Sequence, residues 1–196
     1  MVFDLLTIFP NILDSYLEYG IIKQALKKGL IKINFHSLRE KDKNTDDRPF
    51  GGGPGMVVKA RPIIGALKEI KKYQNKKIIL TSPKGKKFSP ADYPSLDQLI
   101  IICGRYEGVD ERVKKYIDEE ISIGDYILSG GELPAMIMIE AITRLLPGVL
   151  GNEESIKDPG YPQYTQPQDL DGDKVPEVLL SGHHQKIQDW REKNKS

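Results

Sequence analysis

The sequence predicts an α/β fold in which a parallel sheet carries helices on both faces. Short β-rich runs alternate with amphipathic helical patterns along the chain, an order typical of strands joined by crossover helices. Some runs are apolar throughout, as in LIII at 99–102, which indicates strands buried on both faces. A length of 196 residues suffices for one sizeable core, so two domains of ordinary size are not expected.

Apolar spacing, together with glycines and prolines, defines the expected elements. Apolar residues with helical spacing follow Pro10, are interrupted at Gly20 and stop at Gly29, whereas polar residues over 39–47 form a loop that leads into glycines at 51–55. The expected strands span 2–9, 30–35, 77–80, 99–103 and 119–123. The expected helices span 12–26, 62–73, 90–96, 109–117, 132–146 and 183–192.

Composition and charge exclude several classes of protein. Lysine and arginine total 29 against 28 aspartate and glutamate, so bulk positive charge alone does not hold nucleic acid. Cys103 is the only cysteine and ends an apolar run, so we expect it to be buried and structural, in a reducing compartment such as the cytoplasm. The amino terminus lacks the basic start of a secretory signal, and no stretch is long enough to span a membrane.

Three loops are unusually rich in glycine, at 51–55, 104–108 and 124–131. Each alone is typical of a tight turn. Together, near the carboxyl ends of strands in one small domain, they favour a ligand site, because that edge of an open α/β sheet binds ligands. Glycine permits close approach, so backbone N–H and C=O groups can recognise the ligand.

Several familiar sites do not fit these loops. The glycine segments lack the Walker pattern, and Met56 stands where a dinucleotide fingerprint needs its third glycine. No nucleophile elbow surrounds Ser129, and the histidines at 36, 183 and 184 lack metal-ligand spacing, so we expect no transition-metal site. The remaining chemistry is a group transfer that depends mainly on positioning.

Four segments closely resemble the bacterial tRNA (guanine-N1)-methyltransferase family. They read DDRPFGGGPGM at 46–56, CGRYEGVDER at 103–112, SIGDYILSGGELPA at 122–135 and PGVLG at 147–151. The resemblance implies a SPOUT-type fold with a deep trefoil knot in the C-terminal part of the sheet, a homodimer, and transfer of a methyl group from S-adenosylmethionine to N1 of guanosine 37 in tRNA.

The resemblance also suggests the domain organisation. Frequent prolines and glycines after Pro147 predict an extended linker or lid before the last helix. We expect a knotted, cofactor-binding methyltransferase domain at 1–157, a flexible interdomain linker or lid at 158–180, and the start of a C-terminal helical region at 181–196. Family members continue into a small helical domain, so the chain is either part of a longer or fused polypeptide or a shortened enzyme.

Carried over by motif, the methyl donor would lie against residues after three strands. The donor-binding residues implied by the resemblance are Leu80, Thr81, Ser82, Pro83, Gly104, Ile123, Gly124, Asp125, Tyr126, Ile127, Leu128, Gly130, Gly131 and Pro134. Main-chain groups there can read the adenine edge, and the apolar side chains can hold its faces.

Guanine N1 carries a proton at neutral pH, so the reaction needs a general base. The family uses an acid two residues before the proline of a motif that reads PQYTQP here, at 162–167, and that position is Gly160. Asp158 is the candidate in a shortened loop, although KDPG at 157–160 is also a good turn sequence. Glu107 is the second candidate, with hydrogen bonding to the guanine edge as its alternative role.

The remaining implied residues concern the RNA. Arg144 matches a family arginine that could orient the base or stabilise charge on guanine O6, with a surface ion pair as its alternative. The candidate RNA-binding residues are Asp47, Arg48, Pro54, Gly55, Arg105 and Tyr106. The family needs magnesium, but the acids at 118–120 are explained equally well as an exposed strand entry, so the sequence locates no magnesium site.

Gly160, and Gln166 where the family commonly has arginine, leave a second function open. That alternative is a dimeric module that binds cofactor and RNA but has impaired catalysis. The sequence does not identify the tRNA isoacceptors.

Overall fold

The computed structural model describes residues 1–151 and 160–195, and its central feature is a five-stranded parallel sheet with the order β2-β1-β6-β5-β7. In chain order, the elements up to residue 151 are β1 (Val2–Thr7), α1 (Asp14–Leu17), α2 (Gly20–Lys27), β2 (Lys32–Ser37), α3 (Leu38–Lys41), β3 (Asp46–Asp47), β4 (Val57–Val58), α4 (Ala60–Glu69), β5 (Lys76–Lys87), η1 (Pro90–Asp92), β6 (Gln98–Cys103), η2 (Glu111–Tyr116), β7 (Glu119–Ser122) and α5 (Glu132–Arg144).

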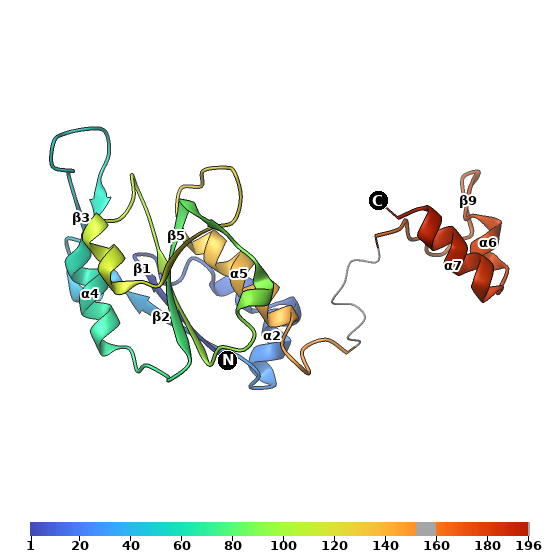
Figure 1. Cartoon of the computed structure of the whole chain (residues 1–196), viewed down its shortest axis with the longest axis horizontal. Coiled ribbons are helices and arrows are strands. Elements are labelled where there is room, and N and C mark those ends of the chain that lie inside the picture. The colour runs from blue at the N-terminus through green and yellow to red at the C-terminus, as the bar shows by residue number, and fades with distance from the viewer. Residues whose placement is uncertain (152–159, 196) are drawn as a thin grey trace. The chain divides into compact units, whose positions relative to one another are not determined.

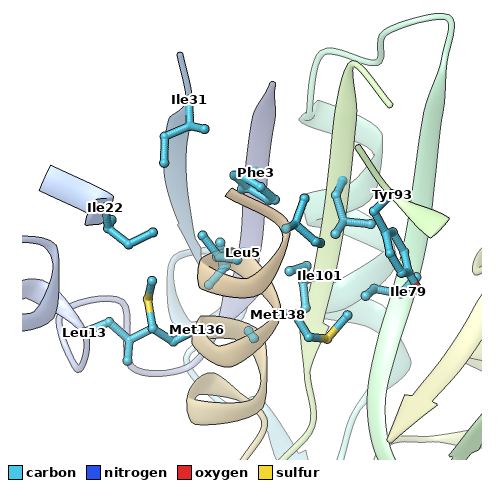
Figure 2. Packing of buried hydrophobic residues seen from close by; sticks show 14 of the residues in the cluster. Phe3, Leu5, Leu13, Ile22, Ile31, Ile79, Tyr93, Ile101, Met136 and Met138 are labelled. Carbon is cyan, nitrogen blue, oxygen red and sulfur yellow. The ribbon is translucent and has the colours of Figure 1, made fainter. Parts of the chain in front are cut away.

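Helices cover both faces of this sheet, which confirms the predicted α/β class (Figure 1). One face packs Phe3, Leu5 and Ile101 against α2 and α5, as Figure 2 shows. The opposite face packs Leu6 and Ile102 against α4 and η2. Neighbouring strand residues therefore enter different cores, and this is why β1 and β6 are mostly apolar on both faces instead of alternating between apolar and polar residues.

Most predicted elements lie within a few residues of the observed ones, and the differences have local causes. β5 continues to Lys87 because its polar second half still pairs with β7, after a register shift between Thr81 and Lys86. A Cβ at Gly85 would lie 2.5 Å from the Glu120 carbonyl carbon, so the strands approach closely there. The predicted helix at 109–117 is a 3₁₀ helix, and the predicted loop at 39–47 contains α3 and β3.

Two compact units, Met1–Gly151 and Asn152–Ser196, divide the chain. The second contains β8 (Asp169–Leu170), β9 (Asp173–Lys174), α6 (Glu177–Leu180) and α7 (His184–Lys193), so the stretch predicted as a linker includes a hairpin and a short helix. Within this unit the Tyr164 and Trp190 rings lie 6.3 Å apart, which packs the segment at 162–167 against α7. The domain boundaries and the trefoil knot stay predictions.

No helix in the described part of the chain combines the length and apolar character needed to cross a bilayer.

One buried carboxylate connects three strands at the amino end of the sheet. Asp4 Oδ1 lies 2.9 Å from Asn34 Nδ2 and 2.7 Å from His36 Nε2, and Oδ2 accepts a hydrogen bond from Gln98 Nε2 at 2.7 Å. Burial alone would raise the pKa of Asp4, but these hydrogen bonds, led by that of His36, hold the pKa below its usual value. Asp4 therefore stabilises the fold only while it is ionised.

Replacing Asp4→Asn should produce a pH-dependent loss of stability. The unfolded aspartate binds its proton near pH 4 and the folded one only at lower pH, so the contribution is complete above about pH 4 and is lost as pH falls further. Urea unfolding from pH 7 to pH 2.5 should show the largest difference between wild type and variant at pH 7. A difference that stays constant down to pH 2.5 would contradict this role of Asp4.

Candidate active site

A cavity of about 460 Å³ lies at the carboxyl ends of β6 and β7, beside the middle of β5, where the pairing of β5 with β6 ends at Thr81. Its walls come from residues 80–84 within β5, from the ends of β6 and β7 and the segments that follow them, and from Pro134 in the first turn of α5. Sequence distance separates these segments, but parallel pairing brings their ends together. Leu80 pairs with Ile102 of β6 and with Glu120 of β7. The cavity is at the edge where parallel sheets bind ligands.

The structure brings together nearly all of the predicted donor-binding residues. The cavity is lined by Leu80, Thr81, Ser82, Pro83, Gly104, Ile123, Gly124, Tyr126, Ile127, Leu128, Gly130, Gly131 and Pro134. Asp125 does not line it. Lining residues that the sequence analysis did not single out include Lys84, Glu111 and Lys114, and Glu120, which it considered only as part of the acids at 118–120, also lines the cavity. Lys114 forms ion pairs with Glu111 and, at 3.1 Å, with Glu120. The spacing of these three residues matches no site motif, so the sequence did not indicate that they line a cavity.

The backbone packing at Gly104 and Gly131 is the tightest feature of this wall. Gly131 N donates to Gly104 O at 2.7 Å. A Cβ at Gly131 would lie 2.0 Å from Thr81 Oγ1 and 2.8 Å from Gly104 N. The segments that contain Thr81, Gly104 and Gly131 therefore meet at a point where only glycine fits. No side chain from Gly104 or Gly131 fills the adjoining cavity, so a ligand can approach the backbone there.

The loop between β3 and β4 is attached to the cavity through Glu107. A Cβ at Gly55 would lie 2.6 Å from Glu107 Cγ, and Glu107 N donates to Met56 O at 3.0 Å. Tyr106 has a φ of 58°, a strained conformation for an aromatic residue, yet its side chain is 47% exposed beside the cavity. Strain of this kind clusters at functional sites.

The other candidate RNA-binding residues lie in different settings. Asp47 is the last residue of β3, and Arg48 begins the loop that joins β3 to β4. The hydrogen bond from the Arg48 N–H and, as the next cause, the ion pair with Lys59 hold the pKa of Asp47 below its usual value. The Arg105 side chain is only 16% exposed and pairs with Glu132 within the chain. The RNA contacts of all six candidates stay predictions.

Of the two candidate catalytic residues that the structure describes, Glu107 and Arg144, only Glu107 lines the cavity. Arg144 is exposed in the last turn of α5, about 18 Å along the helix from Glu132 at 1.5 Å per residue. Asp158 lies outside the described residues, and Gly160 has a φ of +71°.

The acids at 118–120 are engaged in local structure. Asp118 Oδ2 accepts from Ile78 N at 2.7 Å, Glu119 pairs with Lys77, and Glu120 pairs with Lys114. Within the described ranges, no three acidic, histidine or cysteine residues cluster as a metal site. Cys103 is buried as predicted, and burial raises the pKa of its thiol well above the ordinary value, which makes it a poor nucleophile.

Comparison with known proteins gives a consistent result. The model of the tRNA (Guanine-1)-methyltransferase TrmD family matches residues 1–196. A tRNA (guanine-N(1)-)-methyltransferase from Dictyoglomus turgidum is 47% identical over 97% of this chain and 83% of its own length, and one from Staphylococcus carnosus is 46% identical over 100% and 86%. The crystal structure of tRNA (m1G37) methyltransferase from Aquifex aeolicus superposes with a TM-score of 0.85 at 47% identity, covering 97% of this chain and 87% of that one.

The close packing at Gly131 predicts that a single methyl group is damaging there. Gly131→Ala should lower the free energy of unfolding by about 1–3 kcal/mol, because the added Cβ overlaps Thr81 and the Gly104 backbone. Gly65→Ala is the matched control, since a Cβ in this position of α4 meets nothing within 4 Å and alanine favours the helix by up to about 1 kcal/mol. Denaturant unfolding of both variants measures this, and equal stability would contradict the packing argument.

Proposed function

Since the chain belongs to the tRNA (guanine-1)-methyltransferase family, we propose that it binds its methyl donor in the cavity beside the middle of β5 and the carboxyl ends of β6 and β7. The enzyme methylates N1 of a guanosine in tRNA, and S-adenosylmethionine is the donor that the family implies. The observation that carries the proposal is the meeting of Thr81, Gly104 and Gly131, which exposes main chain to a cavity of fitting size.

The residues present fit this donor. Leu80, Leu128 and Pro134 offer apolar contact for the faces of an adenine, and neighbouring backbone groups can hydrogen-bond its edge. When bound, S-adenosylmethionine supplies an electrophilic methyl group on a positively charged sulfonium. The protein contributes orientation, which accounts for up to roughly 7–11 kcal/mol of barrier in favourable cases.

Asp158 is the proposed general base, which removes the guanine N1 proton as the N1–methyl bond forms. Its position two residues before Gly160, in a shortened connection, supports this role. Glu107 is the second candidate, because its side chain lines the cavity and lies against Gly55. Both are carboxylates, so each can accept the proton at neutral pH.

Arg144 is proposed to orient the target base or to stabilise charge on the O6 of that base. The chain is proposed to act as a homodimer. Since Arg144 lies about 18 Å along α5 from the first residue of that helix, an arginine of its own chain is badly placed for the donor cavity. Leu133 and Ile137, one turn apart on α5, are 57% and 48% exposed, and Ile127 in the adjoining loop is 85% exposed. Burial of this apolar surface against a second copy supports the dimer.

Guanosine 37 of tRNA is the proposed target, and the cytoplasm is the proposed location. The exposed Tyr106 ring beside the cavity supports stacking of an unstacked base there. Asp47, Arg48, Pro54, Gly55 and Arg105 remain proposed RNA contacts. No described residues are assigned to magnesium.

Methylation assays should separate this function from the alternative of a binding module without catalysis, which the names of the relatives do not favour. Purified full chain with labelled S-adenosylmethionine should methylate a tRNA transcript that has guanine at position 37, preceded by guanine, because only guanine presents a protonated N1 for this base-assisted transfer. A transcript with adenine at that position is the control. Donor binding by calorimetry without transfer at high tRNA concentration would contradict the enzyme.

Replacing Asp158→Asn should reduce turnover by at least about a hundredfold, a usual contribution of general base catalysis. Donor affinity should stay within twofold, since the proposed role of this carboxylate is to accept the proton of guanine N1 and not to bind the donor. Single-turnover rates and calorimetry measure the two effects, with Glu107→Gln as the parallel variant. An undiminished rate in Asp158→Asn, with loss in Glu107→Gln, would move the base to Glu107.

A further inference from the structure

A buried carboxylate lies behind the cavity wall, at the start of α5. The Glu132 side chain is 2% exposed and follows directly after Gly130 and Gly131. Its Oε1 accepts a hydrogen bond from Thr7 Oγ1 at 2.6 Å, and its Oε2 accepts one from Arg105 Nε at 2.9 Å. A charge is retained in such a place only when it is paired and hydrogen-bonded, and both conditions hold here.

Glu132 connects three segments that are far apart in the sequence. Thr7 is the last residue of β1, and its hydroxyl also accepts from Phe9 N at 2.9 Å, where the chain leaves the sheet. Arg105 follows β6, and its guanidinium lies 4.8 Å from the centre of the Phe9 ring. One carboxylate therefore holds both the end of β1 and the loop after β6 against the first turn of α5.

The ion pair lies directly beneath the glycines that form the cavity wall. A Cβ at Gly130 would lie 2.2 Å from Arg105 Nε and 2.6 Å from Glu132 Oε2. The backbones of Arg105 and Gly130 form an antiparallel bridge, and Gly131 N bonds to Gly104 O beside it. The inward Arg105 side chain thus packs against the Gly130 backbone, and an outward turn would remove this support from the wall.

We propose that Glu132 is a positioning residue, which holds Arg105 inward and thereby fixes Gly104 and Gly130 in the geometry that binds the methyl donor. This inference rests on the proposed donor cavity. Glu132 itself does not line that cavity, so its effect on the donor is transmitted through Arg105. Arg105 accordingly serves the shape of the site, in addition to any contact with RNA.

The test is Glu132→Gln in the full chain, with S-adenosylhomocysteine as the probe. The amide keeps an acceptor for Thr7 but loses the charge that Arg105 requires. We expect the dissociation constant for S-adenosylhomocysteine, corrected for the folded fraction, to rise at least tenfold. We expect kcat/KM for methyl transfer to fall by up to about a hundredfold, because a small misplacement of the donor has an effect of this size. Arg105→Lys, which keeps the charge but lacks the planar fork, should show a smaller change in the same direction.

Asp4→Asn is the matched control, because it also removes the charge of a buried, hydrogen-bonded carboxylate but lies three residues before Thr7 in β1, and Asp4 does not line the cavity. It should lower stability and leave the dissociation constant within twofold. A double-mutant cycle of Glu132→Gln with Arg105→Met adds a second readout. Since both changes break the same ion pair, the double variant should bind the probe about as tightly as the single variant that binds it more weakly.

Two results would overturn the positioning role while sparing the proposed function. In the first, the wild type binds S-adenosylhomocysteine and folded Glu132→Gln binds it with the same dissociation constant. In the second, the losses of binding free energy in Glu132→Gln and Arg105→Met add up in the double variant. Failure of wild-type protein to bind the probe, or binding that is insensitive to a bulky Gly104→Val change, would instead contradict the donor cavity itself.

Discussion

The contact of the Gly131 backbone with the Gly104 backbone and with the Thr81 hydroxyl is the constraint on which the site depends. Parallel pairing fixes Thr81 of β5 beside Cys103 at the end of β6, and the hydrogen bond from Gly131 N to Gly104 O joins the start of α5 to this point. No side chain larger than hydrogen fits at Gly131. The glycines therefore do more than permit a turn: they let three loops converge so that peptide groups, which cannot rotate away as side chains do, face the ligand.

The sequence predicted the part of the fold that depends on local pattern. Strands buried on both faces read as apolar runs, so β1 and β6 were evident, and Gly20 marked the break between α1 and α2. The second half of β5 was missed because its lysines do not favour a strand. Its pairing with β7 depends on the close approach of the two backbones at Gly85, a tertiary contact that the local sequence does not indicate. The apolar spacing at 109–117 also does not separate an α-helix from the 3₁₀ helix η2, which begins after Asp110, whose side chain accepts from Arg112 N.

At the site, the motif predicted position better than role. Two of the three glycine segments assigned to one ligand site, at 104–108 and 124–131, do line the cavity, because their placement after strands fixes where they meet. The third, at 51–55, does not line it and only approaches it through the contact of Gly55 with Glu107. Arg105 shows the limit of such reasoning. An arginine in a polar loop suggests RNA contact, but its partner is Glu132, distant in sequence, and only the packing of the Phe9 ring beside both makes an inward orientation evident. Spacing along the chain carries no information about such a pair.

The proposed roles in donor binding and in proton removal fall on different parts of this chain when Asp158 is the base. The described residues that line the cavity belong to Met1–Gly151, and backbone contacts and the Glu132 ion pair lie behind its wall. The departures from the family pattern, Gly160 and Gln166, belong to Asn152–Ser196. A change at Asp158 is therefore expected to spare the donor site, whereas a change at Glu132 is expected to alter that site without removing the base. The chemistry tolerates the first more readily, because a carboxylate can reach N1 from more than one backbone position, while an in-line methyl transfer accepts little displacement of the donor.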